Sequence, residues 1–104
     1  MSYDYEFDCV VDDIMEEHIN TSEDVDDILR TKLDYYVSCN DYHKNIEIIN
    51  DIAGDVFEAI KKYKDTYGEI NTDCSKPQFY AILTYCVLYD LFQTKVEEKM
   101  NDYS

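Results

Sequence analysis

The chain has 104 residues, of which 24 are Asp or Glu and nine are Lys or Arg, so its formal net charge is -15 at pH 7. DNA, RNA and anionic membrane surfaces recruit patches of Lys and Arg, and the only basic cluster here consists of Lys61, Lys62 and Lys64. The composition therefore argues against direct binding to nucleic acid or to a membrane, and it favours a basic partner.

Length and hydropathy predict a single acidic helical domain over residues 1–104. Apolar residues make up 45% of the chain and recur at helical spacing, while Gly and Pro are rare, which is typical of a folded helical protein rather than a disordered acidic tail. The sequence lacks the run of about 18 to 20 apolar residues that a membrane span needs, and its acidic start differs from a signal peptide. We expect a soluble protein in the cytoplasm, which is the host's if a phage encodes it.

The first predicted helix runs from about Asp4 to Ile19. Its apolar stripe comprises Phe7, Val10, Val11, Ile14, His18 and Ile19. A row of acids at four-residue spacing comprises Asp4, Asp8, Asp12 and Glu16, flanked by Asp13 and Glu17. Residues four apart on a helix are neighbours, with Cβ atoms roughly 5 to 6 Å apart, so we expect one line of negative charge. His18 lies on the apolar stripe and is expected to be a packing residue rather than a metal ligand.

A second helix is expected to start after Thr21 or Ser22, because Asp24 follows Thr21 at the spacing of a capping box. Its inner face comprises Val25, Ile28, Leu29, Leu33, Tyr36 and Val37. Its first turns also carry acids, comprising Glu23, Asp24, Asp26 and Asp27, where carboxylates complement the helix dipole. Glu23 and Asp27 form a second row of negative charge beside the first.

A third helix, capped by Asn40 or Asp41, is predicted to continue for seven turns and to end at Gly68. Its stripe comprises Tyr42, Ile46, Ile49, Ala53, Val56, Phe57, Ile60, Tyr63 and Tyr67. Gly54, followed by a second capping pattern from Asp55, leaves a kink or restart open, but the unbroken stripe favours one long helix. Residues 69–74 form the obvious loop.

The last helix opens at Ser75, with Pro77 just inside, and runs to about Asn101. Between Phe79 and Phe92 it is apolar around nearly its whole circumference, so it must be buried on almost all sides. The sequence therefore predicts a compact all-α four-helix domain in which this helix is central, and the alternative is a homodimer through its spare face.

Catalytic motifs give little support to an enzyme. The sequence has no phosphate-binding glycine loop, no HExxH and no GxSxG, and it has no CxxC pair for zinc. An even number of cysteines allows two disulfides, but reduced cysteines are favoured, with Cys9 and Cys86 packed as small hydrophobes. Acid groups such as Asp13 with Glu16, or Asp51 with Asp55, could bind Mg²⁺ in an all-α nucleotide pyrophosphohydrolase, which is the enzymatic alternative. We otherwise expect no metal and no cofactor.

The acids of the first quarter are the main functional feature. Eleven lie before the first basic residue, Arg30, and like charges four residues apart cost a few tenths of a kcal/mol per pair, so stability does not explain them. Eleven tyrosines add residues suited to contacting arginine. The predicted partner-binding residues are Asp4, Asp8, Asp12, Asp13, Glu16, Glu17, Glu23, Asp24, Asp26, Asp27, Tyr3, Tyr5 and Tyr35.

Small size, strong acidity, helical character and a composition rich in Asn, Ile, Lys, Asp and Tyr resemble the phage-encoded inhibitors of restriction and CRISPR nucleases. The adjacent Tyr35 and Tyr36 resemble, less closely, the paired tyrosines of nuclease immunity proteins. The resemblance lies in size, charge, helical character and composition. It implies a nucleic-acid mimic that blocks the basic cleft of a DNA- or RNA-binding enzyme, with an immunity or antitoxin protein, or a helical dimer of structural role, as alternatives.

Overall fold

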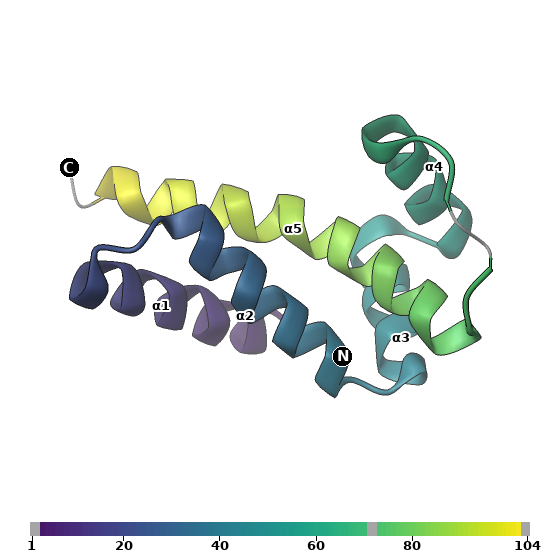
Figure 1. Cartoon of the computed structure of the whole chain (residues 1–104), viewed down its shortest axis with the longest axis horizontal. Coiled ribbons are helices and arrows are strands. Elements are labelled where there is room, and N and C mark those ends of the chain that lie inside the picture. Colours follow the sequence, from purple (N-terminus) through teal and green to yellow (C-terminus); the bar gives the residue numbers. More distant parts are fainter. Residues whose placement is uncertain (1–2, 71–72, 103–104) are drawn as a thin grey trace.

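The computed structural model describes residues 3–70 and 73–102, and within these ranges the chain is all α-helical with no strand. The helices in chain order are α1 (Asp4–Thr21), α2 (Val25–Cys39), α3 (Tyr42–Ala53), α4 (Val56–Tyr67) and α5 (Lys76–Asp102). Figure 1 shows α1 and α2 beside the C-terminal half of α5, with α3 and α4 at its other end. The molecule extends 41 × 29 × 22 Å along its principal axes.

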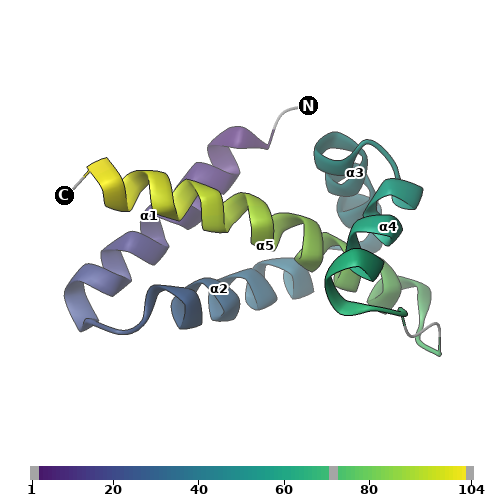
Figure 2. The same cartoon turned by 90° about the horizontal axis from the view of Figure 1, so that it is seen from above.

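Helix α5 is the central element, because it contacts each of the other four helices. It runs through the middle of the view in Figure 2. Between Phe79 and Phe92 only Asp90 is exposed, and Leu83, Leu88 and Phe92 are completely buried. The expected burial of this segment is confirmed within one chain, and a homodimer through it stays a prediction. None of the described helices has the length and apolar character to cross a membrane.

Helices α1 and α2 form an antiparallel hairpin packed on α5. Phe7, Val11 and Ile14 of α1 are fully buried, as is Leu33 of α2. Ile19 is 62% exposed, so its assignment to the stripe was wrong. Successive residues are about 100° apart around a helix, so the side chain of Ile19, next to His18, points away from the core.

The cap of α2 also differs from the sequence prediction. Asp24, rather than Thr21 or Ser22, is the N-cap, and its carboxylate accepts a hydrogen bond of 2.8 Å from the Asp26 amide. Ser22 instead ends α1 in the left-handed conformation, with its amide bonded to the His18 carbonyl. The connection between the two helices is therefore short.

The single long helix predicted from Tyr42 to Tyr67 was wrong, so the described chain has five helices rather than four. Gly54 has a φ of 96°, which costs an L-residue energy but suits glycine, and Asp55 then caps α4 by accepting from the Glu58 amide at 2.8 Å. The break turns α4 about its axis, so the residues of the predicted apolar stripe in α4 do not all face the core. Ala59 is buried, whereas Phe57 is 81% exposed and Tyr67 is 55% exposed.

Candidate protein-interaction surface

Most of the residues predicted to bind a partner are at the surface. Glu17 and Asp26 are half-buried, and Tyr3 is buried. The exposed ones are Asp4, Tyr5, Asp8, Asp12, Asp13, Glu16, Glu23, Asp24, Asp27 and Tyr35. Most of the acidic segment is therefore exposed, but some of its carboxylates pair with cations of other helices and others do not.

Tyr3 is a packing residue in this fold. Its ring stacks on Phe7 with the centroids 5.9 Å apart, and its hydroxyl donates to a carboxylate oxygen of Glu47 at 2.6 Å. This hydrogen bond, together with burial, raises the pKa of Tyr3 to about 12. Tyr3 joins α1 to α3 and is not part of the exposed surface.

The row of acids on α1 faces lysines of α5 over part of its length. Asp8 pairs with Lys95 at 3.1 Å, and Asp12 pairs with Lys99. Because an α-helix has 3.6 residues per turn, each step of four residues advances the row by about 40° around the axis. The row consequently turns away from α5 along its length, and Glu16 at its end is exposed without an ion pair among the described residues.

Other cations reach the acidic segment from α2 and α3. Lys32 pairs with Glu17 at 3.1 Å, and Lys44 pairs with Glu6 at 2.7 Å. Glu6, which sequence reasoning did not single out, also accepts from the Tyr36 hydroxyl at 2.7 Å. Burial alone would raise the pKa of Glu6, but the hydrogen bonds from Lys44 and Tyr36 outweigh it and lower the pKa. Tertiary contacts thus neutralise acids that have no cation nearby in sequence.

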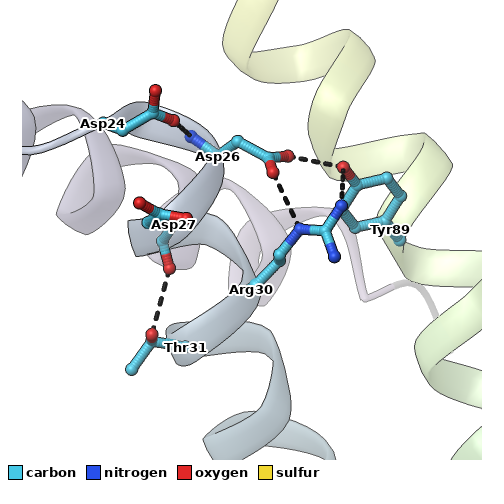
Figure 3. Close-up of polar contacts among 6 residues, drawn as sticks. All are labelled: Asp24, Asp26, Asp27, Arg30, Thr31 and Tyr89. Atoms are coloured by element: carbon cyan, nitrogen blue, oxygen red, sulfur yellow. Dashed lines mark hydrogen bonds and ion pairs between the residues drawn. The ribbon is translucent and has the colours of Figure 1, made fainter.

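Asp26 is held in a network between α2 and α5 (Figure 3). Its carboxylate accepts from Arg30 Nε at 2.7 Å and from the Tyr89 hydroxyl at 2.5 Å. The Arg30 guanidinium lies 5.1 Å from the centroid of the Tyr89 ring. Hydrogen bonds from Tyr89 and Arg30 lower the pKa of Asp26. Asp24 therefore caps α2, and Asp26 joins α2 to α5.

Replacing Asp26 with asparagine is expected to reduce stability at neutral pH and to flatten the loss of stability in acid. The folded-state pKa of Asp26 lies below its ordinary value, so its stabilising contribution is complete above that ordinary value and disappears as the pH falls through the folded-state pKa. Urea unfolding of Asp26→Asn and the parent protein between pH 7 and pH 3 measures the difference, which should shrink on acidification.

Asp27→Asn is the matched control, because Asp27 also lies in the first turn of α2 and its replacement removes the same charge. Its side chain makes no contact with Arg30 or Tyr89 in Figure 3. If the two variants had the same dependence on pH, the network around Asp26 would contribute nothing beyond its charge near the helix terminus.

Between Asp13 and Asp27, four acids are exposed and form neither an ion pair nor a helix cap among the described residues, and we call them the hairpin acidic surface. They are Asp13, Glu16, Glu23 and Asp27. They lie on the second half of α1, in the short connection and on the first turn of α2, and Figure 1 shows this connection near one end of the molecule. His18 Nδ1 donates to the Glu23 carbonyl at 2.6 Å and so ties the connection to α1.

The cysteines give no site for chemistry at this surface. None of the four forms a disulfide, and Cys86 is buried as expected. Cys9 is exposed, so its assignment as a packed hydrophobe was wrong; it follows Asp8 on the outer side of α1. Across residues 3–70 and 73–102 there is no group of three or more His, Cys, Asp or Glu side chains that could hold a metal ion.

Sequence reasoning also missed a cavity of about 380 Å³ between α2, α4 and α5. Three tyrosines line it, comprising Tyr63 and Tyr67 from α4 and Tyr85 from α5, together with Arg30 and Asp34 from α2. The spacing of Tyr63 and Tyr67 on one helix was visible in the sequence, but their meeting with Tyr85 depends on how α4 packs after the break at Gly54.

Comparison of the chain with known protein families, curated proteins and solved structures finds no match.

Proposed function

We propose that this protein is an acidic inhibitor that mimics nucleic acid and blocks the basic cleft of a DNA- or RNA-binding enzyme. The observation that carries the proposal is the hairpin acidic surface, where four exposed carboxylates from two helices and their connection form no ion pair among the described residues. We further propose that it acts in the cytoplasm, that of the host if a phage encodes it.

The overall charge supports this proposal. Six of the nine basic side chains are already engaged in ion pairs with acids of the same chain. Even with every base paired, the acids exceed the bases by 15. Such a surplus creates a negative potential that raises the rate of encounter with a positively charged cleft.

The proposed mechanism requires no bond to be made or broken. Carboxylates of the hairpin acidic surface occupy lysine and arginine sites that otherwise bind phosphates, which follow one another with an axial rise of about 3.4 Å per nucleotide on each strand of DNA. Tyr5 and Tyr35, which are 83% and 72% exposed, add contacts that slow dissociation, because tyrosine buries a large area at low entropic cost. The inhibitor and the nucleic acid then exclude each other from the cleft.

Capture followed by competition tests this function. The immobilised protein is incubated with lysate at low salt, and the retained proteins are challenged with DNA, RNA or raised salt. We expect a basic nucleic-acid-binding enzyme to be retained and to be released by one of the nucleic acids and by salt, since screening shortens the reach of exposed charges to about 8 Å at physiological ionic strength. A partner that stays bound in excess DNA and RNA would contradict mimicry.

The same experiment separates the alternatives. Retention of a nuclease toxin would favour an immunity or antitoxin protein, which uses the same kind of acidic surface. The pyrophosphohydrolase alternative needs a carboxylate cluster for Mg²⁺, and the described parts of the chain offer none with three or more ligands. Release of pyrophosphate from nucleotides by the protein, dependent on added Mg²⁺, would support this alternative instead.

A further inference from the structure

The cavity between α2, α4 and α5 has the size and lining of a binding site. Its volume is about 380 Å³, within the range of roughly 300 to 1,000 Å³ typical of ligand pockets. Val37, Ala81 and Ile82 supply apolar walls, and the buried thiol of Cys86 also lines it. Binding sites of this kind combine such walls with a few polar groups that set specificity.

Aromatic rings form much of the cavity. Tyr63 and Tyr67 lie with their ring centroids 5.1 Å apart and their planes inclined by 44°, and Tyr85 completes the aromatic lining from α5. The ordinary pKa of a tyrosine hydroxyl is about 10, and partial burial raises the pKa of both Tyr67 and Tyr85 further, so their hydroxyls are protonated at neutral pH. The cavity therefore offers neutral ring faces, which attract cations through the ring quadrupole.

The charges at the edge of the cavity leave one carboxylate in excess. Arg30 lines the cavity, but its charge is matched by Asp26 at 2.7 Å and its guanidinium lies over Tyr89. Asp34, one turn further along α2, is exposed and has no ion pair among the described residues. Aromatic faces together with an available carboxylate suit a cation rather than an anion.

We infer that this cavity takes the guanidinium group of an arginine side chain presented by the basic partner. A guanidinium is planar, stacks on aromatic faces and donates two parallel hydrogen bonds to a carboxylate, which matches the three tyrosines and Asp34. The inference rests on the proposed function and adds an anchor to it. The hairpin acidic surface attracts the partner over distance, and the cavity holds one of its arginines.

The position of the cavity allows one partner to reach both regions. Asp27 and Asp34 are seven residues apart on α2 and are both exposed. Seven residues make about two turns, so the two carboxylates lie on the same face of the helix, about 10 Å apart along its axis. This spacing is within the width of an ordinary protein interface.

Titration of the isolated protein with N-acetyl-arginine N-methylamide tests the inference without the partner. We expect saturable shifts of the NMR methyl signals of Ala81 and Ile82, which line the cavity. The matching citrulline derivative has nearly the same shape but no charge, and it should bind at least about tenfold more weakly, since a bidentate ionic contact and a cation–π contact are both lost. Equal binding of the two derivatives would overturn the inference.

Variants assign the roles of the lining residues. Asp34→Asn and Tyr67→Ala should each weaken binding of the arginine derivative by roughly tenfold, whereas Tyr67→Phe keeps the ring and should bind as well as the parent. Glu98→Gln removes the same charge at an exposed position outside the cavity and should have little effect. If Asp34→Asn and Glu98→Gln weakened binding equally, the derivative would be responding to overall charge and the cavity would not be its site.

Failure of the inference is distinguishable from failure of the proposed function. If the arginine derivative does not bind in the cavity while the captured enzyme is still released by nucleic acid, the acidic surface acts without this anchor. If the derivative binds but the captured partner resists nucleic acid, the cavity stands as an arginine site and the mimicry does not.

Discussion

A variant in which Asp13, Glu16, Glu23 and Asp27 are all replaced by lysine is expected to bind the captured enzyme at least about 100-fold more weakly than the parent protein. Like charges brought together in an interface cost several kcal/mol, and a factor of 100 corresponds to about 2.8 kcal/mol. The four residues are exposed and outside the ion pairs that hold α1, α2 and α5 together. Folding should therefore survive. Titration calorimetry at two salt concentrations measures the affinity, and far-UV circular dichroism checks that the helices persist.

A second set of four exposed acids provides the control for net charge. Asp65, Glu69, Glu98 and Asp102 are exposed and lie on other elements, so reversing them changes the net charge by the same amount. This control should lose much less affinity at physiological salt, because separated exposed charges are screened beyond about 8 Å. If both variants lost affinity equally, the negative field of the whole molecule would matter and the hairpin acidic surface would not be the contact.

Replacing Phe7 with alanine is expected to lower the free energy of unfolding by about 3 to 5 kcal/mol. Phe7 is completely buried, and its ring contacts Phe92 edge-to-face with the centroids 5.4 Å apart and Tyr36 at 6.2 Å. It therefore joins α1, α2 and α5. Because domains of this size are stable by only about 5 to 15 kcal/mol, such a loss approaches complete unfolding. Urea denaturation followed by circular dichroism measures it.

Phe57→Ala is the matched control, since it removes the same atoms from a side chain that is 81% exposed. Surface substitutions of this kind usually change stability by less than about 0.5 kcal/mol. The comparison also tests the arrangement of α4, because a continuous helix through Gly54 would have placed Phe57 in the core. If Phe57→Ala lowered the free energy of unfolding as much as Phe7→Ala, the break between α3 and α4 would be contradicted.

Several features of the fold follow from local rules and were predictable from the sequence. Helix α5 begins next to Ser75 as predicted, where Ser75 and Gln78 exchange hydrogen bonds in a reciprocal cap, and the apolar segment after it is buried. The inner face of α2 is also as predicted, with Ile28, Leu29 and Leu33 buried. These features depend on residues three or four apart in the chain, whose proximity is fixed by the geometry of a helix.

The candidate site was only partly predictable. The exposure of Asp13, Glu16 and Asp27 follows from helical periodicity. The buried position of Tyr3 and the contribution of Tyr63 to the cavity do not, because each depends on a contact with a different helix. The break at Gly54 was visible as an alternative, but a stripe of apolar residues does not record the backbone conformation of the glycine that interrupts it.

The sequence by itself determined that the chain is helical, where most of its apolar faces lie, and that its acids gather in the first quarter. Only the tertiary structure decided which acids stay exposed without a cation. Asp8 and Asp12 meet Lys95 and Lys99, each 87 residues away, whereas Glu16 on the same row does not. The reason is geometric. Acids four residues apart turn gradually around a helix of 3.6 residues per turn. The packing of α5 against α1 therefore decides which of these acids lie close to its lysines.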